Sequence, residues 1–189
     1  MCSSDLPEYI IEPTDFGLRA IGRRSSGDRI TYYHMPNVGV IAVPPVGDEI
    51  DWATLVVWRV PVDDYSNRSF NVRRARKKPG SPVKPVVDRS AEQVAVSLDI
   101  LAGRRKLEDI SAKDRELLVP VQDNLALIGQ GAIADRGPAE NLGRSDAGII
   151  ALRRLWRTEL QKLSDGLAVK QWPWPQHGMK VTSGAKGSD

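Results

Sequence analysis

The chain has 189 residues, of which 41% are hydrophobic and 27% are charged, and its formal net charge is +3. This composition is typical of a globular domain of ordinary size. No apolar run approaches the roughly 20 residues that a membrane-spanning helix needs, and the mild positive charge does not by itself predict nucleic-acid binding. The single cysteine, Cys2, excludes an intrachain disulfide framework and a cysteine-based zinc or iron–sulfur site within this chain. Such sparing use of cysteine predicts a cytoplasmic protein.

The first half of the chain predicts antiparallel β-strands, because segments rich in β-branched and aromatic residues alternate with short turns. The predicted strands are Phe16–Ile21, Arg29–Met35, Val38–Val43, Ala53–Val62 and Asn67–Arg74. Val38–Val43 is almost continuously apolar, which is typical of a strand covered on both faces. Pro61 indicates that its strand ends at a sheet edge or a bulge.

The segment Ala75–Ser90 is basic and contains three prolines, so it predicts a long exposed loop. No aromatic residue interleaves with its charges, as would be expected on a surface that stacks nucleic-acid bases. We therefore expect no nucleic-acid partner. A docking surface for a partner protein is the alternative, and the sequence does not decide it.

After Ser90 the composition predicts helices. Ser111 and Asp114 form a Ser-x-x-Asp pattern, which is typical of a helix start. Pro120 is expected to end that helix or to begin the next one, because proline removes a backbone donor.

The clearest predicted helix is Ser145–Gly166, with Ser145 as its N-cap and Gly166 at its end. Its apolar stripe predicts packing against a core. The stripe consists of Ile149, Leu152, Trp156, Leu160 and Leu163. Gln171–Asp189 predicts a partly disordered tail in which Trp-Pro pairs hold the chain to the body. Strands followed by helices predict an α+β fold with helices packed on an antiparallel sheet.

Asp123 lies among apolar residues in a predicted helix, and a carboxylate is costly to bury without a partner. One interpretation places Pro120 at the first helical position, so that Asp123 lies in the first turn and complements the helix dipole. The other interpretation makes Asp123 a metal ligand. From these residues alone, the first interpretation is favoured.

Five stretches resemble, in order, the C-terminal catalytic domain of Rieske non-haem iron oxygenases. They are "EPTDFGLRAIGRR", "YYHMPNVGVIAVPP", "WRVPVDD", "VQDNLALIGQGAIADR" and "ENLGRSDAGIIALRRL". The resemblance is strongest to the aromatic-ring-hydroxylating alpha subunits of the phthalate dioxygenase type. It covers most of Glu12–Leu163 and is most specific from Gln122 to Leu155. It implies a helix-grip fold of the START/Bet v1-like kind, here incomplete.

In that family two histidines and one carboxylate hold a mononuclear Fe(II), and Asp123 falls at the carboxylate position. The resemblance therefore favours the metal-ligand interpretation. It implies that a ferredoxin or flavin reductase supplies electrons through a Rieske [2Fe–2S] cluster, and that the iron uses O₂ to hydroxylate or demethylate an aromatic or similar apolar substrate. It also implies a homo-oligomer, commonly a trimer. Many relatives carry a glutamate five residues after the ligand, where this chain has Ile128.

The Cys-x-His and Cys-x-x-His pairs of the family's cluster domain are not in this sequence, nor is its pair of iron-binding histidines. The two histidines present, His34 and His177, are better interpreted as structural, with His34 near the pocket wall. We therefore expect residues 7–170 to be the C-terminal part of a longer catalytic domain, truncated at its N-terminus and inactive by itself.

Residues 1–6 are expected to be an assembly artefact, because "CSSDL" back-translates to the end of a widely used sequencing adapter. An ordinary polar N-terminus is the alternative. A rival function belongs to another class, a non-catalytic helix-grip module that binds an apolar ligand without metal. Asp123 discriminates between the two functions, since a purely apolar cavity needs no carboxylate there.

Overall fold

The computed structural model describes residues 8–23, 28–43, 50–77, 80, 87–111, 114–134, 136–137 and 140–179. The chain forms two compact units. Residues 1–82 and 141–189 form the first, called the sheet unit below, and residues 83–140 form the second, called the helical unit. The proposed artefact at residues 1–6 and the last ten residues of the tail lie outside the described residues.

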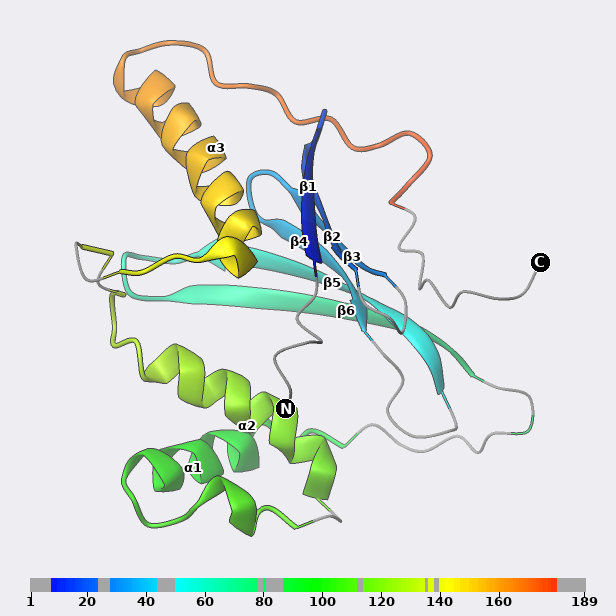
Figure 1. Ribbon diagram of the computed structural model, residues 1–189, viewed down its shortest axis with the longest axis vertical. Helices are drawn as coiled ribbons and strands as arrows, with labels where there is room; N and C mark the ends of the chain where they lie inside the picture. The colour runs from blue at the N-terminus through cyan, green and yellow to red at the C-terminus, as the bar shows by residue number, and fades with distance from the viewer. Residues whose placement is uncertain are drawn as a thin grey trace. The chain divides into compact units, whose positions relative to one another are not determined.

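The sheet unit is built on a six-stranded antiparallel sheet in which each strand pairs with its neighbours in sequence (Figure 1). The strands are β1 (Glu8–Thr14), β2 (Gly17–Arg23), β3 (Arg29–His34), β4 (Val38–Val43), β5 (Ile50–Pro61) and β6 (Asn67–Lys77). All five predicted strands are confirmed, and β4 has its predicted bounds. β1 is not among the predicted strands, because Glu12 and Pro13 interrupt its apolar pattern.

The structure differs from the strand predictions in two ways: in where β6 ends, and in how many residues of β4 are buried. β6 continues through Lys77, so the first three residues of the predicted basic loop belong to a strand instead. β4 is fully buried only at alternate residues, Val38, Val40 and Ala42, because one face of the sheet is covered more closely than the other. β5 pairs with β4 only as far as Trp58, so Pro61 lies beyond that pairing at the end of its strand, as predicted.

One face of the sheet carries an apolar cluster and is called the tail face here. Because side chains alternate across a strand and directly paired residues share a face, the register places His34 on this face together with the cluster. The cluster consists of Ile21, Ile30, Tyr32, Val38 and Val40. Met179, in the C-terminal tail, packs against it. The tail therefore covers part of this face, in agreement with the expectation that the segment containing the Trp-Pro pairs is held to the body.

The opposite face, called the α3 face, is where α3 (Ala147–Ser164) contacts β1 and β2 (Figure 1). A Cβ atom at Gly148 would lie 3.4 Å from the Cδ1 atom of Ile11, which shows how closely the helix approaches the sheet. An antiparallel sheet packed against a helix confirms the predicted α+β, helix-grip-like class.

The two ends of α3 differ in how well the sequence predicted them. Gly166, with a φ of +69°, ends the helix as predicted. The amide of Leu167 donates to the carbonyl oxygen of Lys162 at 2.8 Å, which is the bonding pattern of a Schellman C-cap. Ser145 is not the N-cap, because it lies in a short 3₁₀ turn, η4 (Arg144–Asp146), that precedes α3.

The apolar stripe of α3 is only partly buried. Leu152 is half-buried, whereas the side chains of Leu160 and Leu163 are 54% and 64% exposed. The prediction that the whole stripe packs into a core is therefore wrong, both for Ile149, which is 47% exposed, and for the C-terminal half of the helix. There the stripe borders a cavity instead of a sheet.

The helical unit pairs α1 (Ser90–Leu101) with α2 (Arg115–Ile128), with the 3₁₀ turn η2 (Leu107–Asp109) between them in sequence. Val96 of α1 and Leu117 and Val121 of α2 form its buried cluster. A polar contact adjoins this cluster: the amide of Asn124 donates to the hydroxyl oxygen of the fully buried Ser97 at 3.3 Å. The start of α1 at Ser90 agrees with the predicted onset of helical structure.

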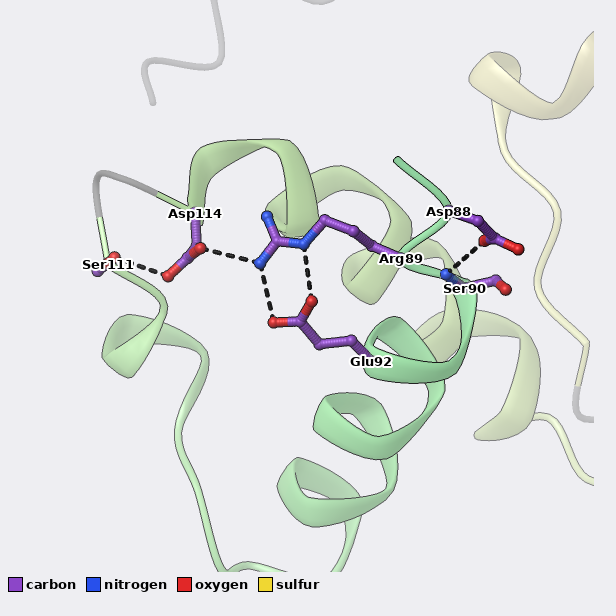
Figure 2. Close-up of polar contacts among 6 residues, drawn as sticks. All are labelled: Asp88, Arg89, Ser90, Glu92, Ser111 and Asp114. Atoms are coloured by element: carbon purple, nitrogen blue, oxygen red, sulfur yellow. Dashed lines mark hydrogen bonds and ion pairs between the residues drawn. The ribbon is translucent and has the colours of Figure 1, made fainter. Parts of the chain in front are cut away.

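Arg89 links the beginnings of the two helices (Figure 2). Its guanidinium donates to both carboxylate oxygens of Glu92, at 2.7 and 2.8 Å, and to Asp114 at 2.9 Å. Hydrogen bonds and the nearby positive charge from Arg89 lower the pKa of Glu92 and of Asp114. We call these three residues the Arg89 clasp.

The path of α2 differs from both alternatives predicted for Pro120. The helix neither ends nor begins there, because Pro120 is the sixth residue of a continuous helix, Arg115–Ile128. An interior proline forfeits one backbone hydrogen bond, and the burial of Leu117 and Val121 on either side offsets that loss. Ser111 does not cap the helix either, since its hydroxyl donates to the Asp114 side chain at 2.9 Å.

Among the described residues, no helix is both long and apolar enough to cross a membrane.

Candidate functional site

Asp123 lies on the exposed side of α2 within the helical unit. Leu117 and Val121, four residues apart, mark the buried stripe of the helix at 2% and 0% exposure, and Asp123 lies off that stripe. The premise that its carboxylate is buried among apolar side chains is therefore wrong for this unit. Asp123 also lies well beyond the first turn of α2, so the helix-dipole interpretation is wrong as well.

An exposed carboxylate on a rigid helix is chemically suited to ligate Fe(II), since carboxylate oxygen is one member of the facial triad. Within the described parts of the chain, however, no three His, Cys, Asp or Glu side chains come together as a metal-binding group. These residues therefore do not form a complete triad. At most, Asp123 supplies one ligand to a site whose other ligands come from elsewhere.

A partly open cavity of about 570 Å³, called the sheet cavity here, lies on the α3 side of the sheet unit. Its walls come from the β3–β4 region, from the end of β5 and the start of β6, and from α3. The lining residues are Tyr33, His34, Met35, Pro36, Asn37, Val38, Gly39, Ile41, Val57, Arg59, Pro61, Asn67, Leu152 and Trp156. The volume lies in the range of roughly 300–1,000 Å³ that is typical of small-molecule sites.

A second cavity, of about 540 Å³, lies where the C-terminal half of α3 and the tail meet the β3–β4 turn. We call it the tail cavity. It contains one acidic residue, Glu159, whose carboxylate pairs with Lys162 at 2.7 Å and accepts the amide hydrogen of Lys170. The hydrogen bond from Lys162 is the main reason that the pKa of Glu159 is lowered. Its negative charge is therefore already compensated.

His34 borders both cavities and is 5% exposed. Its ring stacks on Trp174 at a centroid distance of 4.0 Å and on Phe16 at 5.8 Å. Its Nε2 atom lies 3.2 Å from the carbonyl oxygen of Pro173. Because a carbonyl oxygen only accepts, Nε2 must carry the hydrogen. Nδ1 is buried with no hydrogen-bond partner among the described residues.

Gly17 permits this placement of His34, its partner across β2 and β3. Gly17 has a φ of +145°, and a Cβ atom there would lie 2.0 Å from the carbonyl oxygen of Tyr33. Only glycine accommodates both the conformation and the close approach. The amide of Met35 donates to the carbonyl oxygen of Phe16 at 2.9 Å, which holds the end of β3 against the β1–β2 turn.

His34 is thus a pocket-lining side chain, as the more conservative interpretation predicted. His177 is exposed in the tail, and none of the contacts described for this part of the chain joins it to His34.

Comparison with known proteins finds one informative similarity. The 5,5'-dehydrodivanillate O-demethylase oxygenase subunit of Sphingobium sp. (strain NBRC 103272 / SYK-6) is 36% identical over 110 residues. The matched region covers 58% of this chain but only 23% of the relative. No protein-family model matches the chain. The chain is thus similar to part of an oxygenase subunit, in broad agreement with the resemblance identified from the sequence motifs.

Of the residues that line the cavities, the sequence predicted only His34 to lie near a pocket wall. Arg59 and Asn67 belong to strands that the pattern predicted correctly, but the pattern says nothing of the helix that faces them. The sequence feature that could have placed Arg59 at the cavity is the alternation of side chains along β5, which puts Arg59 on the same face as Val57.

Proposed function

We propose that this chain forms part of the catalytic domain of a Rieske-type oxygenase that hydroxylates or demethylates an aromatic or similar apolar substrate. The observation that carries the proposal is the 36% identity over 110 residues to the oxygenase subunit of an O-demethylase. The sheet cavity supports it, because its aromatic and aliphatic walls suit a ring-sized apolar molecule. O-demethylation is the reaction favoured by the name of that relative.

In this proposal Asp123 is the carboxylate ligand of a mononuclear Fe(II), and the two histidine ligands lie outside this sequence. When bound, the iron activates O₂ with electrons that a ferredoxin or flavin reductase delivers through a [2Fe–2S] Rieske cluster. The described residues contribute the binding surface: Val57, Leu152 and Trp156 form part of the apolar lining of the sheet cavity. We further propose that the complete enzyme is a cytoplasmic homo-oligomer, with a trimer as the expected form.

The test begins with the genomic sequence upstream of Pro7. We expect it to encode the Cys-x-His and Cys-x-x-His pairs and a closely spaced pair of histidines. The protein expressed from that longer gene should contain [2Fe–2S] clusters and additional iron, and it should release formaldehyde from methoxylated aromatic compounds when a reductase and O₂ are supplied. An upstream sequence without these motifs, or a purified protein without iron, would refute the proposal.

A second candidate function is a helix-grip module that binds an apolar ligand without metal. It is favoured by one observation, that no aspartate or glutamate lines the sheet cavity among the described residues. A longer protein that binds methoxylated aromatic compounds but contains no iron would select this candidate.

A further inference from the structure

A third cavity, of about 260 Å³, lies on the α3 face between β1–β3 and the start of α3, and we call it the polar cavity. Its lining includes five residues that carry a hydroxyl or guanidinium group, namely Tyr9, Arg29, Thr31, Tyr33 and Ser145. No aspartate or glutamate lines it among the described residues. The polar cavity therefore combines several hydrogen-bond donors with one positive charge.

The register of β1, β2 and β3 explains why a hollow forms here. Tyr9 pairs with Gly22, and Gly22 pairs with Arg29, so the tyrosine and the arginine share a face of the sheet with only a glycine between them. In the next row on that face, Ala20 pairs with Thr31. Two small residues of β2 therefore form the floor of the cavity, and larger polar side chains of the neighbouring strands surround it.

Arg29 is oriented by one hydrogen bond and keeps its other donors free. Its Nε atom donates to the carbonyl oxygen of Ala42 at 3.0 Å, which anchors the guanidinium near the end of β4. Within the described part of the chain, its two terminal nitrogens have no acceptor. Asp146, the acid that follows Ser145, instead accepts the amide hydrogen of Gly143 at 2.8 Å. The charge of Arg29 is therefore not balanced by an acid of the cavity lining.

The hydroxyl groups of the polar cavity come from three elements: β1 supplies Tyr9, β3 supplies Thr31 and Tyr33, and η4 supplies Ser145. None of them has a hydrogen-bond partner among the described residues. Burial raises the pKa of Tyr33, the nearby Tyr9 raises it further, and the charge of Arg29 offsets part of the increase. These three side chains therefore lie near one another, and Tyr33 is a neutral phenol that can donate at neutral pH.

We propose that the polar cavity binds a phosphate group, either as the free ion or as part of a small ester. The terminal nitrogens of an arginine match two phosphate oxygens with parallel hydrogen bonds. The remaining oxygens of a tetrahedral ion project in other directions, where hydroxyl groups from β1, β3 and η4 can donate to them. A carboxylate has only two oxygens, which lie in one plane, and would leave part of this donor set unused. The assignment does not depend on the proposed function, in which the sheet cavity holds the substrate.

Calorimetric titration of the full chain with sodium phosphate tests the assignment. A constant ionic strength keeps the screening of charges equal between titrations. The wild-type chain should bind phosphate stoichiometrically, and it should bind acetate at least about tenfold more weakly. Arg29→Gln should weaken phosphate binding by about 10- to 100-fold, as expected for lost hydrogen bonds between charged groups. Tyr33→Phe should weaken it by about tenfold, since it removes one hydroxyl donor and keeps the ring.

Arg68→Gln and Tyr65→Phe are the matched controls. Each removes the same chemical group from an exposed residue of the β5–β6 hairpin that does not line the polar cavity. Both variants should bind phosphate with wild-type affinity. Tyr33→Phe keeps the test decisive if Arg29→Gln, which also loses the hydrogen bond to Ala42, fails to fold.

Titration with glycerol 3-phosphate distinguishes the two sources of the phosphate group. Binding of the ester at least as tight as that of the free ion assigns a small phosphate ester, and weaker binding of the ester assigns inorganic phosphate; either result supports the site. Three results would overturn the assignment: no binding of either phosphate compound, acetate binding as tight as phosphate binding, or wild-type phosphate affinity in a folded Arg29→Gln or Tyr33→Phe variant.

Discussion

The sheet unit contains the sheet cavity and the tail cavity, of about 570 and 540 Å³, whereas the helical unit carries Asp123 on an exposed face of α2. Binding of an apolar ring requires a concave, mostly apolar surface, which a sheet and a facing helix provide. Ligation of a metal ion requires only a donor atom held in a fixed orientation, which a two-helix unit can supply. In the proposed function, recognition and ligation therefore belong to different parts of this chain, and substitutions should alter them separately.

The chain offers a built-in means of observing one unit alone. All five tryptophans, at positions 52, 58, 156, 172 and 174, belong to the sheet unit. Tryptophan fluorescence therefore reports on the sheet unit, while circular dichroism at 222 nm reports on all three α-helices.

The largest expected effect on stability comes from the core of the helical unit. Leu117→Ala should lower the free energy of unfolding of this unit by about 2–5 kcal/mol, because Leu117 is 2% exposed and lies in the cluster with Val96 and Val121. Denaturant unfolding followed by circular dichroism should show the loss, while the tryptophan transition should not move.

Leu127→Ala is the control for that prediction, since Leu127 lies on the same helix and is 62% exposed. It should change the free energy of unfolding by less than about 0.5 kcal/mol. If Leu117→Ala shifted the tryptophan transition as far as the helical signal, the two units would unfold together and the separation drawn here would be wrong.

A smaller effect is expected in the sheet unit, at His34. His34→Ala removes a stacking contact with Trp174 and the hydrogen bond to Pro173, so we expect a loss of about 1–3 kcal/mol. His34→Phe keeps a ring between Phe16 and Trp174, and should therefore cost less than His34→Ala. Tryptophan fluorescence during denaturant unfolding measures both. Equal losses in the two variants would show that stacking is unimportant.

The smallest effect concerns the Arg89 clasp and depends on pH. The folded-state pKa values of Glu92 and Asp114 lie below their ordinary values of 4.5 and 3.8. The clasp therefore stabilises the helical unit fully above those values, and its contribution is lost as the pH falls below them toward the lowered folded-state values.

Arg89→Gln should flatten this acid dependence of the helical transition while leaving the tryptophan transition unchanged. Melting curves followed by circular dichroism between pH 7 and pH 3 provide the measurement. An acid dependence as steep in Arg89→Gln as in the wild-type chain would show that the clasp does not contribute.

Local patterns predicted much of the sheet unit, and long-range packing explains where they failed. β4 was predictable to the residue because its apolar run is bounded by turns. β1 was missed because it gains stability mainly from pairing with β2, a contact that no local pattern encodes. The end of α3 was predictable because Gly166 is needed there for its positive φ.

The candidate sites were less predictable, for a related reason. The exposure of Asp123 depends on which side of α2 packs against α1, and one sequence with apolar residues on several sides does not settle that. The passage of α2 through Pro120 likewise reflects burial of its neighbours, which overrides a local helix-breaking preference. The tail cavity joins residues more than 100 positions apart, such as His34 and Trp174, and the Trp-Pro pairs were its only local signal.

The central claim, that Asp123 is an iron ligand, is tested most directly by counting iron in the protein expressed from the longer gene. Asp123→Ala should lower mononuclear iron severely and abolish turnover, while the [2Fe–2S] absorbance remains. Glu116→Ala, which removes another exposed acid from α2, should keep full iron and full activity. An Asp123→Ala protein that retains full iron and full turnover would contradict the assignment.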